Sequence, residues 1–208
     1  MSIIKRITGT SLFQYMKKIL FFSVLFVFFM AIIIFMYRDK IAYVGSVDFI
    51  EVDCKKKCEI LRKVYESDQR IRKDNNLIKY AKEDHRNQEL VVSIIEKCGM
   101  PSLDEVTQKE MDAIWLTLQH TVKKFRKKYF PQIEKAVENG DLSKEQYAIM
   151  KDRILMDEGK PQLYGSQIKN GKLYKLESPE FVNDRRKEMG MEPIEEYLEY
   201  FGIYFDSK

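Results

Sequence analysis

The sequence predicts a mainly α-helical protein, in which a single transmembrane helix at the N-terminus precedes one compact helical domain with a small β-hairpin. Three observations lead to this prediction. An uncharged apolar run lies near the start of the chain, apolar residues with helical spacing and two capping boxes follow after residue 51, and one Asn-Gly dipeptide stands inside an alternating segment.

The apolar run covers residues 19–37 and contains no charged side chain. At about 1.5 Å of rise per residue, a helix of this length covers the ~30 Å hydrocarbon core of a membrane. We therefore expect residues 19–37 to lie in the lipid bilayer as a signal-anchor. A cleaved signal peptide and a buried helix of a soluble protein are the alternatives. The run exceeds the ~7–15 apolar residues of a signal peptide, and the charged residues 38–40 follow it where a cleavage site would need small side chains.

The charges on either side of this run predict its orientation. Residues 1–18 carry four basic and no acidic residues, whereas residues 38–53 carry two basic and four acidic residues. Because basic flanks stay in the cytoplasm, we expect a single-pass protein of the cell membrane with a cytoplasmic N-terminus. Residues 38–50 are then a juxtamembrane connector, and residues 51–208 are an extracytoplasmic helical domain.

Charge and cysteine content limit the partners and cofactors. The 36 basic and 32 acidic residues leave a net charge of +4 without a cationic patch, so we expect no nucleic acid partner. Cys54, Cys58 and Cys98 form no zinc pattern with His85 and His120, and we expect no metal and no cofactor. Cys54 and Cys58 have the i, i+4 spacing that allows a shared metal or a strained disulfide. We expect unpaired thiols on a helix instead.

Helical spacing and helix-end signals predict the elements of the domain in order. Capping boxes at Thr107 to Glu110 and at Ser143 to Gln146 mark two helix starts, and Gly190 marks a helix end. The predicted helices cover residues 51–73, 89–98, 108–122, 125–137, 144–156, 178–190 and 193–201.

One β-hairpin is predicted at residues 167–176. Apolar and polar residues alternate there around Asn170-Gly171, the dipeptide that accepts positive φ at both central positions of a type I′ turn.

Polar residues on two otherwise apolar helices are candidates for chemistry. On a helical wheel of residues 108–122, the apolar side chains form one stripe and His120 falls on the opposite side. Asp152 and Arg153 lie in a helix that is apolar around most of its surface. Because a charge removed from water is costly without a partner, we expect this pair to be hydrogen-bonded. An ordinary ion pair between helices is the alternative.

The loop at residues 159–167 supplies Gln162, Tyr164 and Gln167, which are donors and acceptors without net charge. Such groups suit the binding of a sugar or a peptide, and they suit a structural turn equally. Arg185, followed by a second arginine, could clamp a carboxylate or phosphate, with a solvated basic surface as the alternative.

Several short motifs follow one another in a specific order. They are Asp68-Gln69 with Arg72, Trp115 to Gln119-His120, Tyr147-Ala148 to Asp152-Arg153, the 159–167 loop, and Arg185-Arg186 with Gly190. In this order they resemble a bacterial family known as domain of unknown function 6624, over about residues 51–201. In that family the loop typically reads Pro-Gln-x-Tyr-Gly-Thr-Gln, and Ser166 here keeps the hydroxyl. The resemblance implies no established activity, but it favours a shared polar site.

Three functions stay open. In a cell-envelope hydrolase or lyase, His120 would be the general acid or base, Asp152 would orient it, and Arg153 or Arg185 with Tyr164 would stabilise negative charge. In a binding or interaction module, the same groups would hold an envelope ligand or a protein partner. In a structural domain, they would form a buried packing network. We expect a ligand-handling polar site.

Overall fold

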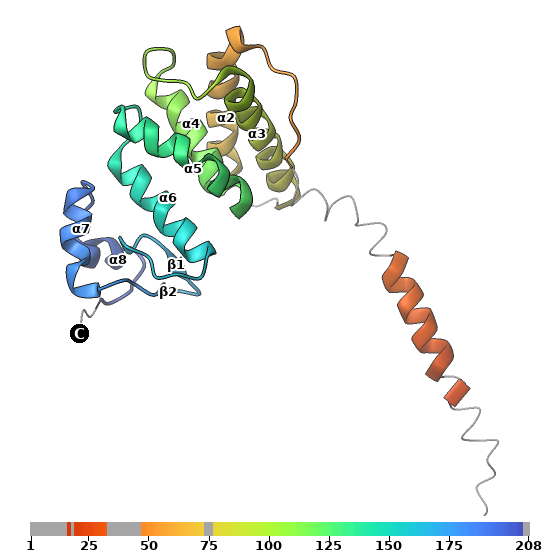
Figure 1. The fold of residues 1–208 in the computed structure, drawn as a ribbon. Coiled ribbons are helices and arrows are strands. Elements are labelled where there is room, and N and C mark those ends of the chain that lie inside the picture. The colour runs from red at the N-terminus through yellow and green to blue at the C-terminus, as the bar shows by residue number, and fades with distance from the viewer. Residues whose placement is uncertain (1–15, 18, 33–46, 73–76, 206–208) are drawn as a thin grey trace, which may run out of the picture. The chain divides into compact units, whose positions relative to one another are not determined.

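The computed structural model describes residues 16–17, 19–32, 47–72 and 77–205, and it divides into two units, Met1–Ser46 and Val47–Lys208 (Figure 1). In the first unit, residues 19–32 are helical and most of their large apolar side chains are exposed. No helix within the described ranges is both long and apolar enough to cross a membrane. Residues 33–37 of the predicted span, and most of the connector, lie outside those ranges, so the transmembrane helix stays a prediction.

The second unit is mainly helical with one two-stranded hairpin, as the sequence predicts. Its elements are η1 (Cys54–Lys56), α2 (Lys57–Ile71), α3 (Leu77–Cys98), α4 (Gln108–His120), α5 (Lys123–Glu138), α6 (Lys144–Asp157), β1 (Ile168–Lys169), β2 (Lys172–Leu173), η2 (Pro179–Phe181), α7 (Val182–Glu188) and α8 (Ile194–Glu199).

Two apolar clusters hold this unit together. Helix α2 packs on α3 and α4, α4 also contacts α3 and α5, and α5 packs on α6. The large cluster between them includes the fully buried side chains of Leu61, Ile94, Ile114 and Ile133, each of which contributes about 1.5–3 kcal/mol by leaving water. A second, small cluster joins α7, α8 and the hairpin. Figure 1 shows these last elements at the opposite end of the unit from α2 and α3.

The predicted helix starts and the predicted hairpin turn are confirmed where short sequence motifs specify them. Both capping boxes are present, and at the second the Gln146 amide donates to Ser143 Oγ at 3.1 Å. In the hairpin, Asn170 and Gly171 have φ values of 54° and 70°, as the type I′ turn requires.

Helix α3 begins twelve residues before the predicted start at residue 89. Its first half reads as polar, because buried positions there are occupied by His85, Asn87 and Gln88 rather than by apolar residues. The apolar periodicity that predicts a helix is therefore lost, although the segment is helical.

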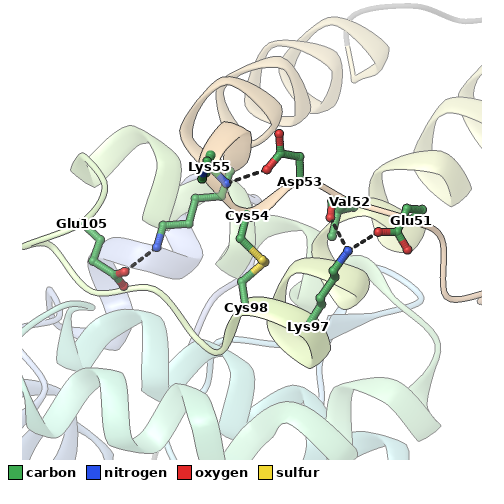
Figure 2. Close-up of a disulfide and its surroundings, with 9 residues drawn as sticks. Glu51, Val52, Asp53, Cys54, Lys55, Lys97, Cys98 and Glu105 are labelled. Carbon is green, nitrogen blue, oxygen red and sulfur yellow. Dashed lines mark hydrogen bonds and ion pairs between the residues drawn. A yellow bond between two sulfur atoms is a disulfide. The ribbon is translucent and has the colours of Figure 1, made fainter.

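The prediction of unpaired thiols was wrong for two of the three cysteines. Cys54 forms a disulfide with Cys98, with their Cα atoms 5.7 Å apart (Figure 2). The thiol of Cys58 is free. The Cys58 thiol donates to the Glu105 carbonyl at 3.4 Å. Spacing along one helix draws attention to Cys54 and Cys58, whereas the actual partner comes from the end of α3, which packs beside α2.

The disulfide is one of several links between the start of the unit and α3. The Ile50 amide donates to Ser93 Oγ at 2.9 Å. Lys97 Nζ donates to the Val52 carbonyl at 2.8 Å and pairs with Glu51 (Figure 2). These contacts fix the segment that follows the predicted connector.

Candidate functional site

His120 is the last residue of α4, and its side chain is 25% exposed. Its Nδ1 lies 2.5 Å from Nη2 of Arg72, the C-cap residue that follows α2. A guanidinium has only donor groups, so Nδ1 of His120 must accept this hydrogen bond. The hydrogen-bond network therefore assigns the proton of the neutral ring to Nε2.

Asp68 fixes the position of Arg72. Asp68 lies one helical turn earlier and is only 1% exposed, and its two oxygens accept from Nε of Arg72 at 3.1 Å and from Nη2 at 2.5 Å. Tyr80 of α3 accepts from Nη1 at 2.6 Å. A bidentate carboxylate pair holds the plane of a guanidinium as well as its charge, so Asp68 aims Arg72 at His120.

Asp84 extends this network into α3. One of its oxygens lies 3.9 Å from Nη2 of Arg72, and the other accepts from Gln88 at 2.7 Å. Gln88 in turn accepts from Thr121 Oγ1 at 3.0 Å, just after α4. Burial raises the pKa of Asp84, while the hydrogen bond from Gln88 and the charge of Arg72 oppose that increase.

Arg153 approaches the cluster from α6. Its Nε donates to Gln167 Oε1 at 3.1 Å, and among the described residues its Nη1 and Nη2 have no hydrogen-bond partner. Burial lowers the pKa of Arg153, Asp157 opposes this, and the charge of Arg72 lowers it further. Arg72 and Arg153 are thus close enough to affect each other.

These surroundings keep His120 neutral at pH 7. Burial is the largest cause that lowers the pKa of His120 to about 4, and the positive charges of Arg72 and Arg153 add to it. Asp68, whose Oδ1 lies 3.8 Å from Nδ1, opposes the decrease.

The low pKa predicts that acid destabilises the domain through His120. An unfolded histidine titrates near pH 6.5, so between about pH 6.5 and pH 4 the unfolded state binds more protons than the folded state. The contribution of His120 to stability is complete above pH 6.5 and is lost as the pH falls, by at most roughly 3 kcal/mol. We expect the urea midpoint to fall less between pH 7 and pH 4.5 in His120→Gln than in the native protein.

Comparing the native protein with His120→Gln separates the effect of His120 on stability from the effects of other titratable groups. The raised pKa of Asp84 acts with the opposite sign, because stability from that group is lost as the pH rises through its folded-state pKa. Asp84 is present in both proteins, so its effect cancels to first order. Identical pH profiles for the native protein and His120→Gln would contradict the assignment.

Asp152 does not face His120. It is fully buried and accepts hydrogen bonds from the Leu163 amide at 2.7 Å, the Tyr164 amide at 3.1 Å, and the Ser166 amide and hydroxyl at 3.0 and 2.9 Å. The acid beside His120 is Asp68 instead. Consecutive helical residues point about 100° apart, so Asp152 turns toward the loop while its neighbour on α6 turns toward the cluster. The expected orienting role of Asp152 is therefore not matched by this geometry.

The side-chain amide of Gln162 forms its hydrogen bonds within the loop and to the hairpin. Gln162 is fully buried, and its Nε2 donates to the carbonyls of Gln167 at 3.0 Å and Tyr174 at 2.9 Å, while its Oε1 accepts from the Gln167 amide at 2.8 Å. Gly165 has a φ of 71°, and a Cβ there would lie 2.4 Å from the Ile194 side chain. These contacts fit the structural-turn alternative for the loop.

Arg185 and Tyr164 also belong to this loop region. Arg185 donates from Nε to the Leu163 carbonyl at 2.7 Å and from Nη2 to the Glu177 carbonyl at 2.5 Å. Burial raises the pKa of Tyr164 to about 12. The structure therefore joins Arg153 to Gln167 and brings Arg153 within electrostatic range of His120. It places Asp152, Gln162, Tyr164 and Arg185 around the loop.

Asp68, Arg72, Tyr80 and Asp84 were not among the predicted site residues. The signal for two of them was present, since Asp68 and Arg72 stand one helical turn apart in the first motif of the family resemblance. Tyr80 and Asp84 lie in the part of α3 that sequence periodicity did not predict. Within the described ranges, no group of three or more histidine, cysteine or acidic residues is arranged to hold a metal ion.

The fold and this cluster define a helical domain with a partly exposed polar site formed by α2, α3, α4 and α6. The chain belongs to the family of unknown function DUF6624, whose model matches residues 56–206. The resemblance of the ordered motifs is thereby confirmed. No curated protein and no solved structure matches the chain.

Proposed function

We propose that the protein is a membrane-anchored extracytoplasmic protein whose helical domain binds an anionic group of an envelope ligand at Arg72, His120 and Arg153. The observation that carries this proposal is the contact of Arg72 Nη2 with His120 Nδ1 at a partly exposed position. Arg153 lies close enough to lower the pKa of the same imidazole.

Unused donor groups in the cluster favour an anion. Asp68 balances the charge of Arg72 through its bidentate contact, whereas Arg153 contacts the neutral amide of Gln167 and keeps two nitrogens without a partner among the described residues. A carboxylate or phosphate matches the fork of donors on a guanidinium.

The disulfide supports the extracytoplasmic location. Disulfides persist in oxidising compartments and are rare in the cytosol of mesophiles, and Cys54 and Cys98 are bonded. The charge distribution around residues 19–37 favours the same side of the membrane. Under this proposal, residues 19–37 bind the lipid bilayer.

A hydrolase or lyase is the second candidate, and the neutral, partly exposed imidazole of His120 favours it. General-base catalysis needs a ring nitrogen without a proton that faces the ligand. In the observed arrangement the nitrogen without a proton, Nδ1, already accepts a hydrogen bond from Arg72. Binding needs no rearrangement of this contact, so it is the better supported function.

Anion binding is testable by NMR because the chain contains only two histidines. We expect the His120 ring resonances of the full chain in detergent micelles to shift saturably with inorganic phosphate or acetate. Arg153→Gln should weaken this binding about tenfold, the cost of one hydrogen bond to a charged group. The unfolding midpoint of Arg153→Gln should be measured in parallel.

Lys172→Gln is the matched control, since it removes one positive charge from an exposed position of β2. It should bind the anions as the native protein does. No saturable shift, or equal weakening in the two variants, would overturn the proposed site.

A further inference from the structure

A hollow lies beside the first half of α6, on the helix face that carries Arg153 one to two turns later. It is a cavity of about 320 Å³ between α6, the 159–167 loop, and α7 with α8. This volume falls at the lower end of the range of about 300–1,000 Å³ that is usual for small-molecule sites. The apolar part of its lining comes from Ile149, Met191 and the ring of Tyr197.

Arg186 contributes a buried positive charge to this cavity. It is 1% exposed, and its Nε donates to the Glu192 carbonyl at 2.5 Å while its Nη1 donates to the Tyr164 carbonyl at 2.7 Å. In the described part of the chain, no carboxylate forms an ion pair with Arg186, and Nη2 has no hydrogen-bond partner. The ring of Tyr197, whose centroid lies 5.0 Å from Cζ of Arg186, partly stabilises the buried charge. Nη2 can still donate to an anionic group that enters the cavity.

Two carboxylates, those of Glu145 and Glu192, also line the cavity, and both residues are exposed. They would repel a simple anion that approaches Arg186. They would attract a positively charged group on the same ligand. The cavity thus has a buried positive charge, two exposed negative charges and an apolar wall.

We propose that this cavity binds a small zwitterion, a free α-amino acid with an apolar side chain. The carboxylate pairs with Nη2 of Arg186, the ammonium group lies near Glu145 and Glu192, and the side chain contacts Ile149 and Met191. This site is distinct from the anion site at His120, because Arg72, His120 and Arg153 do not line it, although Ser166 of its lining contacts Gln167, the partner of Arg153.

The test is calorimetric titration of the full chain in detergent micelles with three probes. Leucine carries both charges, N-acetyl-leucine lacks the ammonium group, and leucinamide lacks the carboxylate. We expect saturable binding of leucine, with each of the other two probes weaker by about tenfold or more, since each loses a hydrogen bond to a charged group. No saturable binding of leucine at millimolar concentrations, or equal binding of leucinamide, would overturn the proposal.

The exposed carboxylates provide variants that do not depend on the structural contacts of Arg186. The double variant Glu145→Gln with Glu192→Gln should weaken leucine binding and strengthen that of N-acetyl-leucine, reversing the preference between the two probes. Glu196→Gln, on the exposed surface of α8, removes a charge outside the cavity and should change neither. An unchanged preference in the double variant would also overturn the proposal. Phosphate binding observed through His120 should persist in all of these variants, which separates a failure of this site from a failure of the first.

Discussion

Asp152→Ala is expected to lower the free energy of unfolding by about 3–5 kcal/mol, because several buried hydrogen bonds to a charged acceptor are lost at once and each contributes about 1.5–3 kcal/mol. The substitution leaves the amides of Leu163, Tyr164 and Ser166, and the Ser166 hydroxyl, without their acceptor. Each buried donor that loses its partner carries a desolvation cost of about 1–3 kcal/mol. Urea unfolding followed by circular dichroism measures the change.

Asp184→Ala is the control, because Asp184 is an exposed acid in the first turn of α7. Its effect should stay within about 0.5 kcal/mol, as for most surface substitutions. If Asp152→Ala unfolded like the native protein but lost ligand binding, the anchoring role would be wrong and a role in the site would replace it.

The loss of Asp152 should also affect the cavity beside Arg186. The Tyr164 amide donates to Asp152, and the Tyr164 carbonyl accepts from Arg186. One peptide segment of the loop therefore connects the buried negative charge of α6 with the buried positive charge of α7. A loop freed from Asp152 would no longer hold the carbonyl that positions Arg186.

Much of the fold could be predicted because its local signals agree with its packing. The capping boxes before α4 and α6 and the Asn170-Gly171 turn are short-range features, and each specifies its element without knowledge of the rest of the chain. The first half of α3 could not be predicted in this way. Its buried positions carry polar side chains whose partners come from other helices, so their burial follows from tertiary packing alone.

The candidate site was predictable to a smaller extent. His120 and Arg153 stand out as polar residues on apolar helices, and the structure brings them close enough for the charge of Arg153 to lower the pKa of His120. Asp152 stands out for the same reason but points about one quarter of a turn away, and no sequence pattern tells which of two adjacent residues faces the site. Arg72 could be assigned to the site only from the packing of α2 against α4, which the order of residues along the chain does not reveal.

Removing the disulfide is expected to lower the free energy of unfolding by about 4 kcal/mol, from the loop-closure entropy of a cross-link across some 44 residues. The variant that tests this is Cys54→Ser with Cys98→Ser, which leaves no reactive partner for the remaining thiol at Cys58. Its stability should equal that of the native protein measured with reductant. Both effects should appear as a lower urea midpoint.

Cys58→Ser is the matched control, since the serine hydroxyl can still donate to the Glu105 carbonyl and the disulfide is retained. It should unfold like the native protein without reductant and lose stability when reductant is added. If reductant changed neither protein, the hydrogen bonds of Ile50 and Lys97 to α3 would suffice to hold the start of the unit. The disulfide would then give no support to an oxidising compartment, and the extracytoplasmic location would rest on the charges around residues 19–37 alone.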